Sequence, residues 1–152
     1  MVVFRIGRTK YSHDLTGEGA RLHGGRWNHV LVPCIYTSES RALALLELTV
    51  NVNIDDIPRA LSISTIEIPE DIIKELSVAE LPGDWDYSPS PTSTKDMGSD
   101  LLKTAEAAVL KIPSAILPLE FNYILNPLHP DSAKFKLIFV EDFVYDVRIK
   151  TK

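Results

Sequence analysis

The sequence predicts an α+β fold, because segments with strand character and segments with helix character follow one another without a regular strand–helix repeat. The chain has 152 residues, of which 45% are hydrophobic. A chain of this size can bury roughly 70% of its unfolded surface in one core. No internal repeat or low-complexity tract divides it, so we expect a single domain over residues 1–152.

The first third of the chain predicts a strand, a long loop and a second strand. β-Branched and aromatic residues over 2–6 predict the first strand, which ends at Gly7. Residues 8–33 carry glycines and polar side chains with little periodicity, so we expect a loop that holds at most a short helix. The run at 34–37 predicts the second strand.

A helix is predicted to begin at Ser38 or Ser40, since either serine can cap it, and to end near Asn51. Leucines occur on both of its sides, so we expect it to be apolar nearly all round and central in the fold. One face combines residues at the i, i+3, i+4, i+7 spacing, namely Leu43, Leu46, Glu47 and Val50.

The middle of the chain predicts a polar connection over 51–58 and a strand over 61–68, which Pro69 closes. A short helix is expected over 71–76. Three prolines and several serines predict a loop over 81–94. This loop holds Trp85 and Tyr87, which could anchor it in the core, form a lid or provide a partner-binding patch.

The last third predicts one helix and three strands. A helix is expected over 94–102, although Gly98 weakens that prediction. A strand over 107–112 is stopped by a proline, and two further strands are expected over 136–140 and 143–148. The last of these shows alternating apolar and polar residues.

Composition excludes several classes of protein. The net charge of −5 at pH 7 argues against direct binding to duplex nucleic acid, because such proteins present a basic face. The only cysteine, Cys34, excludes an internal disulfide and is typical of a reducing compartment. The first residues turn polar too soon for a signal peptide, and no apolar run is long enough to span a membrane. We therefore expect a cytoplasmic protein that does not contact membranes.

Two arginines beside a pair of glycines predict an anion site. Arg21 and Arg26 flank Gly24 and Gly25. Glycines let the backbone approach a ligand closely, and arginines bind phosphate or carboxylate groups in a bidentate fork. The segment lacks both the Gly-Lys-Ser/Thr loop of P-loop proteins and the spaced glycines of Rossmann folds, so neither kind of nucleotide site is supported.

Glu47 is the only charged residue between Arg41 and Asp55, and it interrupts an apolar helix face. An unpaired buried carboxylate is unfavourable, so Glu47 is expected to pair with a cation or to have a raised pKa. A buried ion pair that fixes packing would meet this requirement, and so would a catalytic or ligand-positioning acid.

Polar residues gather again over 112–130, among prolines and apolar residues. Ser114 directly follows a predicted strand, where functional side chains often emerge, although a turn serine would look the same. A serine hydrolase built from Ser114, His129 and Asp131 lacks the Gly-x-Ser-x-Gly elbow. The four histidines also lack metal-ligand spacing, so we expect no metal site.

Together these segments resemble the RES domain, a family named for its arginine, glutamate and serine. The resemblance runs over nearly the whole chain. Its blocks are Gly17-x-Gly-Ala, Gly24-Gly-Arg-Trp-Asn28, Ile35-Tyr-Thr-Ser38, Ala42-Leu-Ala-Leu-Leu-Glu47, Ile112-Pro-Ser114, Glu120-x-Asn-Tyr-Ile-Leu-Asn-Pro127 and His129-Pro-Asp131.

The resemblance implies a bacterial toxin of a type II toxin–antitoxin pair. The implied fold is similar to that of ADP-ribosyltransferases, with a small mixed or antiparallel split sheet and flanking helices. Such toxins use NAD⁺ as a substrate, not as a cofactor, and cleave its nicotinamide–ribose bond by hydrolysis or phosphorolysis. The implied partner is an antitoxin with an Xre-type helix-turn-helix domain, and a homodimer is compatible with the size of the chain.

Two alternatives to NAD⁺ degradation stay open. Some relatives transfer ADP-ribose to a protein, and a non-catalytic module would only bind a nucleotide. The sequence also departs from the family pattern at two positions that concern loop shape. Leu31 stands where many members have glycine, and Val147 replaces a common proline.

The resemblance also implies the site residues. The family's catalytic residues fall on Arg26, Tyr36 and Glu47. The implied substrate-binding residues are Arg5, Gly25, Asn28, Ser114 and Asn122.

The chemistry of NAD⁺ suits these residue types. Its pyrophosphate fits Arg26 and Arg5, and Tyr36 can stack on the cationic nicotinamide ring. Cleavage of the N-glycosidic bond passes through an oxocarbenium-like state, which the carboxylate of Glu47 can stabilise. Ser114 can hydrogen-bond the nicotinamide or a phosphate.

Overall fold

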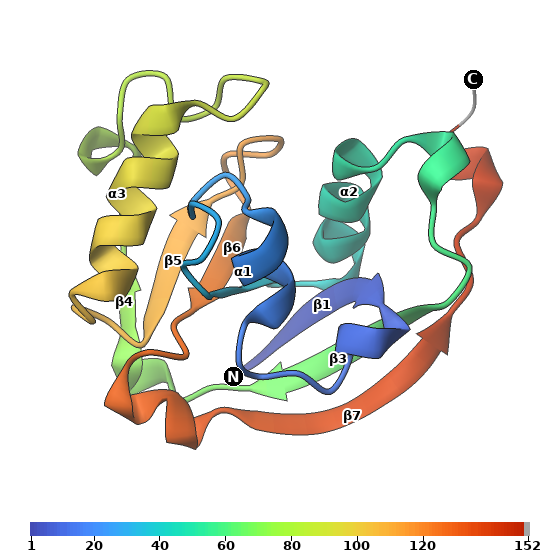
Figure 1. Ribbon diagram of the computed structural model, residues 1–152, viewed down its shortest axis with the longest axis horizontal. Coiled ribbons are helices and arrows are strands. Elements are labelled where there is room, and N and C mark those ends of the chain that lie inside the picture. Colours follow the sequence, from blue (N-terminus) through green and yellow to red (C-terminus); the bar gives the residue numbers. More distant parts are fainter. Residues whose placement is uncertain (151–152) are drawn as a thin grey trace.

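The structure is a computed structural model that describes residues 1–150, and these form a seven-stranded sheet with three α-helices packed around it (Figure 1). The strands are β1 (Val2–Arg8), β2 (Ile35–Ser38), β3 (Leu61–Glu67), β4 (Ile73–Glu75), β5 (Val109–Pro113), β6 (Phe121–Leu125) and β7 (Lys136–Phe143). The helices are α1 (Glu18–His23), α2 (Arg41–Asn51) and α3 (Thr92–Lys103). Short 3-10 helices lie at Thr9–Tyr11, Ile54–Asp56, Glu70–Ile72, Val78–Glu80, Pro130–Lys134 and Val147–Ile149.

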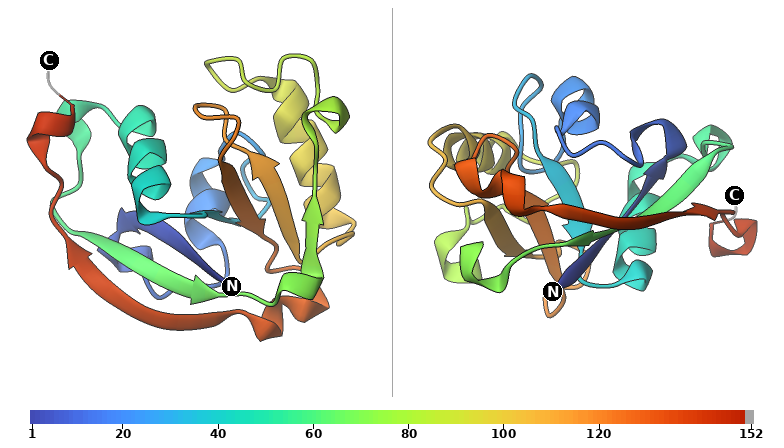
Figure 2. Two further views of the ribbon diagram at one scale, coloured as in Figure 1. Left: turned by 180° about the vertical axis from the view of Figure 1, so that it is seen from behind. Right: turned by 90° about the horizontal axis from the view of Figure 1, so that it is seen from below.

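The sheet has the order β4-β5-β6-β2-β1-β3-β7. Its neighbouring strands run antiparallel except β4 and β5, which are parallel. β1 and β2 pair only at Phe4 and Ser38, so the sheet is nearly divided into two halves there (Figure 2). The α+β class, the mixed and nearly split sheet and the flanking helices are confirmed.

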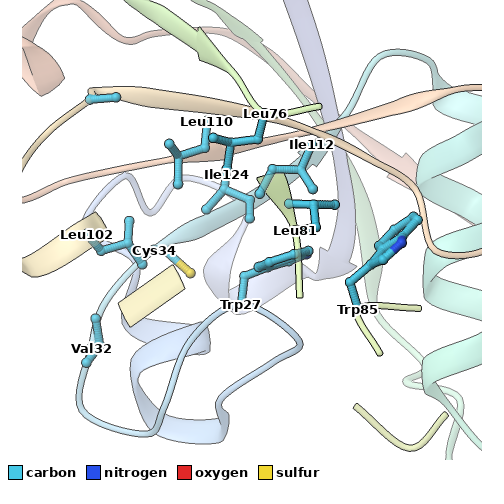
Figure 3. Packing of buried hydrophobic residues seen from close by; sticks show 11 residues of the cluster. Trp27, Val32, Cys34, Leu76, Leu81, Trp85, Leu102, Leu110, Ile112 and Ile124 are labelled. Atoms are coloured by element: carbon cyan, nitrogen blue, oxygen red, sulfur yellow. The ribbon is translucent and has the colours of Figure 1, made fainter. Parts of the chain in front are cut away.

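Three clusters of buried apolar residues pack on the sheet. One of them contains both Val3 of β1 and Ile35 of β2, so it joins the two halves. Figure 3 shows the cluster under α3, where Trp27 and Trp85 from two loops pack near Leu110 and Ile112 of β5. Under α2, a smaller cluster combines Ala44 with apolar residues of β1 and β3. Trp85 is buried, so the proline- and serine-rich loop is anchored in the core.

α2 begins where the sequence predicts, because Ser40 caps it by accepting a hydrogen bond from the backbone N–H of Leu43 at 3.0 Å. It is not the central helix that we expected. It flanks the sheet over β1, and the side chain of Val50 is 53% exposed. The apolar residues of α2 are divided between the sheet and an open cleft, which explains why leucines occur on both sides.

Two predicted elements are wrong, and the strand β6 was missed. Residues 70–72 form a 3-10 helix in place of the helix expected over 71–76, and β4 follows because its backbone pairs with β5. Residues 143–148 are not a strand, since β7 runs unbroken to Phe143 and a 3-10 helix follows. Tyr145 on the expected apolar face is buried, but Val147 on the same face is 66% exposed, so the alternation does not mark a continuous buried face.

The predicted helix over 94–102 is confirmed as α3, which continues through Gly98. A Cβ atom at this position would lie 1.9 Å from the carbonyl oxygen of Trp27. The missing side chain therefore lets α3 lie directly against the loop that contains Trp27. Within the described residues, none of the helices has the length and apolar character that a membrane span requires.

Candidate active site

A cleft of about 490 Å³ opens over the junction between the two halves of the sheet. Its wall includes residues of β1, β2, β6, α2 and α3, the loop around Gly25 and the end of β5. The charged side chains in this wall, within the described part of the chain, are Arg5, Arg26, Glu47 and Lys95. A smaller cavity of about 220 Å³ adjoins it and shares Arg5 and Tyr36. The cleft is therefore mainly basic, although the whole chain is acidic.

Glu47 reaches the cleft from α2, and two neutral groups hold its carboxylate. Its Oε1 accepts hydrogen bonds from Ser114 Oγ and from Asn122 Nδ2, each at 2.7 Å. No described residue forms a salt bridge with Glu47 or donates to Oε2. The expected cation partner is thus not present in residues 1–150. We expected Glu47 to be buried on the helix face. This is wrong, because its side chain is only partly buried and borders the cleft.

Ser114 is fully buried at the end of β5, behind Glu47. Its Oγ accepts hydrogen bonds from the backbone N–H groups of Ile116 and Leu117, at 3.1 and 3.3 Å. These bonds leave the hydroxyl hydrogen to be donated to Glu47. The structure thus places Ser114 where it fixes the acid, and not in the wall of the cleft.

Asn122 in β6 continues this network. Ser38 Oγ donates to Asn122 Oδ1 at 2.7 Å, so the Nδ2 end of the amide is directed to Glu47. Three strands or strand ends therefore combine to orient one carboxylate oxygen, and Oε2 is left available to a ligand.

Arg26 follows the double glycine and lies beside the loop that leads to α3. Its Nη1 donates to the carbonyl oxygens of Trp85 and Tyr87, at 3.0 and 2.7 Å. No described residue accepts a hydrogen bond from its Nε or Nη2. Nη1 therefore binds the loop. Nε and Nη2 lie on the opposite edge of the guanidinium, where they can donate together to two oxygens of an anion.

Arg5 extends from β1 and holds the segment that follows this strand. Its Nη2 donates to the carbonyl oxygens of Tyr11, Ser12 and Asp14, at 3.0 to 3.2 Å. Burial lowers the pKa of Arg5, and the nearby charge of Asp14 opposes that shift. An arginine with such partners stays cationic at neutral pH.

Tyr36 in β2 packs against Gly25. Its hydroxyl donates to Asn28 Oδ1 at 2.6 Å and accepts from the backbone N–H of Trp27 at 2.9 Å. Burial raises the pKa of Tyr36 well above its usual value. A Cβ atom on Gly25 would lie 2.7 Å from the tyrosine hydroxyl, so this position requires glycine. The ring and the glycine together form part of the cleft wall.

Asn28 lies behind this wall. Its side chain is fully buried, and its Nδ2 donates to the carbonyl oxygens of Ala20 and Val32, each at 2.9 Å. Direct contact between Asn28 and a substrate stays a prediction that this arrangement does not favour, because its polar atoms are occupied by the protein.

The structure thus brings most of the predicted site residues to one cleft. Those in the wall are Arg5, Gly25, Arg26, Tyr36, Glu47 and Asn122, whereas Asn28 and Ser114 support them from behind. Within residues 1–150, no three His, Cys, Asp or Glu side chains are placed to hold a metal ion. Sequence reasoning missed Lys95, whose Nζ donates to the carbonyl oxygen of Gly25 at 2.6 Å. No motif marks this lysine, because only the packing of α3 brings it to the cleft.

The chain is similar to known proteins of one family. A family model described as the RES domain matches residues 2–147. The chain belongs to the RES domain family. It is 38% identical to the Prs ADP-ribosylating toxin of Sphingobium sp. (strain YBL2) over 148 residues, which is 95% of this chain and 92% of that protein. It is also 38% identical to Toxin Res of Photorhabdus laumondii over 136 residues, which is 89% of this chain and 87% of that protein.

A solved structure shares the RES fold seen here. The toxin–antitoxin complex MbcT–MbcA of M. tuberculosis contains a chain that superposes with a TM-score of 0.71, over 93% of this chain and 83% of that one. The two chains are 18% identical, so this likeness concerns the fold alone.

Proposed function

We propose that this RES-family protein is the toxin of a bacterial toxin–antitoxin pair and that it cleaves the nicotinamide–ribose bond of NAD⁺. The observation that carries the proposal is one carboxylate, Glu47, held by two neutral donors at the edge of a basic cleft. Such a cleft suits a substrate with an anionic pyrophosphate and a reacting centre that becomes positive.

The reaction breaks the bond between C1′ of the ribose and the ring nitrogen of nicotinamide. Nicotinamide leaves with the bonding electron pair as a neutral molecule, and the ribose develops oxocarbenium character. Glu47 stabilises that positive charge because its carboxylate is fixed before the reaction and needs no reorientation. Water or phosphate then adds at C1′ and gives up a proton. NAD⁺ is thus consumed as a substrate, and no additional cofactor takes part.

The other residues of the cleft bind and orient NAD⁺ in this proposal. The free edge of Arg26 contacts the pyrophosphate, and Tyr36 offers a flat face to the nicotinamide ring. Ser114 and Asn122 act through Glu47, since both donate to its Oε1.

An antitoxin is the proposed partner. The relatives named above are toxins, and the structural neighbour was solved in a toxin–antitoxin complex. The resemblance to RES toxins favours an antitoxin with an Xre-type helix-turn-helix domain. A substrate of this kind also favours a cytoplasmic location, where NAD⁺ is found.

Transfer of ADP-ribose to a protein is the second candidate function, because one relative at 38% identity is named an ADP-ribosylating toxin. The experiment that separates the two incubates the purified protein with NAD⁺ labelled in its adenylate part, with and without cell lysate. Degradation predicts free ADP-ribose, or its 1′-phosphate when phosphate is added. A labelled protein band that accounts for the consumed NAD⁺ would favour transfer. Binding of NAD⁺ without any turnover would identify a non-catalytic module and refute both.

A further inference from the structure

We propose that Lys95 is a substrate-binding residue that holds the pyrophosphate of the dinucleotide together with Arg26. This inference rests on the proposed function and deepens it, since it assigns the phosphate contacts to two specific cations. Lys95 lies in the first turn of α3, and its Nζ meets the carbonyl oxygen of Gly25. It thereby approaches the residue directly before Arg26.

Lys95 has donors that the protein does not use. An ammonium group carries three hydrogens, and Lys95 Nζ donates one of them to Gly25 at 2.6 Å. No described residue forms a salt bridge with Lys95, although its side chain is half-buried in the cleft wall. A cation with unused donors in a cleft wall can form charge-assisted hydrogen bonds to an anionic ligand.

The net charge of the cleft wall matches the binding of a dianion. Arg5, Arg26 and Lys95 carry three positive charges, and Glu47 carries one negative charge. A pyrophosphate diester carries two negative charges, so its binding would neutralise the wall. Arg26 already directs its Nη1 to two carbonyl oxygens, which leaves Lys95 as the cation with the most freedom to follow a phosphate.

The packing of α3 fixes the backbone position of Lys95. Gly98 brings the helix against the carbonyl of Trp27. The backbone N–H of His29 donates to Ser99 Oγ at 2.9 Å, and the ring of His29 contacts Asp96 at 2.6 Å. Three residues of α3 thus contact the loop that carries Arg26. These contacts hold the backbone of Lys95 next to Arg26, so that only its side chain has to be ordered when a phosphate binds.

The direct test is calorimetry with ADP-ribose, which contains the pyrophosphate and cannot turn over. Lys95→Gln removes the charge and keeps a donor for Gly25. We expect it to weaken ADP-ribose binding by about tenfold, which corresponds to about 1.4 kcal/mol.

Lys103→Gln is the matched control, because this exposed lysine lies in the last turn of the same helix. We expect the control to bind like the wild type. Equal affinity of the Lys95→Gln and wild-type proteins would overturn the inference, as would a wild type that does not bind ADP-ribose.

Kinetics separates a phosphate contact from a structural role. Lys95→Gln should raise KM for NAD⁺ and leave kcat nearly unchanged, and it should not alter cleavage of nicotinamide riboside, which lacks phosphate. An equal loss with both substrates would show that Lys95 only supports the fold. A wild type that binds ADP-ribose but releases no nicotinamide would refute the proposed activity, while the calorimetric comparison would still decide the role of Lys95.

Discussion

Glu47 is the residue on which the proposed reaction depends, and Ser114 and Asn122 hold its carboxylate beside the cleft. Its place among leucines marks it as an acid that requires an explanation, and the resemblance to RES domains gives it a role. The helical spacing does not reveal its partners, because Ser114 and Asn122 lie 67 and 75 residues away in sequence. Both partners are neutral side chains, so neither forms an ion pair with the carboxylate.

Ser114→Ala tests the support of Glu47. The substitution removes one of its two donors and leaves the N–H groups of Ile116 and Leu117 without their acceptor in a buried place. We expect nicotinamide release to fall roughly 10- to 100-fold, because the acid is misplaced. The free energy of unfolding, measured in urea, should fall by about 1–3 kcal/mol. Ser93→Ala removes a hydroxyl that does not contact Glu47 and should keep full activity. Full activity of Ser114→Ala would contradict a positioning role.

Cys34 borders the smaller cavity beside the cleft and provides a test of burial there. Its side chain is 1% exposed, and burial raises the pKa of its thiol to about 12. The thiolate is the reactive form, so a raised pKa keeps the native thiol inert at mildly alkaline pH. We expect iodoacetamide to label the protein only after denaturation, as measured by mass spectrometry. Rapid labelling of the native protein would show that this region is open.

At the scale of elements, β3 and α2 were predicted from their sequence patterns, whereas the strands β4 and β6 were not. β3 and α2 follow their sequence patterns to within a residue or two. β4 has three residues and exists because β5 offers it an edge to pair with, which local sequence does not encode. β6 was missed because its asparagine and flanking prolines obscure a strand that lies between β5 and β2.

Gly98→Ala tests the contact between α3 and the loop of the cleft. Alanine favours a helix by about 1 kcal/mol over glycine, but its Cβ would lie 1.9 Å from the carbonyl oxygen of Trp27. We expect the clash to prevail and to lower the free energy of unfolding by about 2–3 kcal/mol. Gly83→Ala is the control, since a Cβ there meets nothing within 4 Å and should change stability by less than about 0.5 kcal/mol. A stabilised Gly98→Ala protein would contradict this packing.

Leu31 stands where many RES domains have glycine, and its substitution tests whether leucine strains the loop. It has a φ of 80°, a left-handed conformation that suits glycine, and its side chain is 69% exposed. Leucine is strained there by about 1–2 kcal/mol, and the greater backbone freedom of unfolded glycine offsets part of that. Thermal and urea unfolding of Leu31→Gly should therefore show a gain of about 0.5–1 kcal/mol. A less stable variant would indicate that the leucine side chain has a role of its own.

At the scale of the whole molecule, the nearly divided sheet creates the cleft. β1 and β2 share a single registered pair, and the two halves carry α2 with Glu47 on one side and α3 with Lys95 on the other. The motif residues of the cleft could be predicted, because they lie in recognisable blocks. Lys95 could not, because it reaches the site through packing between distant segments. The chain carries a net charge of −5, yet its cleft is basic, which composition alone does not reveal.

The most direct test of the account is nicotinamide release from NAD⁺ by purified wild-type protein and by Glu47→Gln. Glutamine keeps an oxygen that can accept from Ser114 and Asn122, so the change removes only the charge. The account predicts steady release by the wild type and a loss of at least about 100-fold in Glu47→Gln, with an unchanged melting temperature. Glu106→Gln, which alters an exposed carboxylate that pairs with Lys74, should keep full activity. Undiminished nicotinamide release by Glu47→Gln would contradict the central claim.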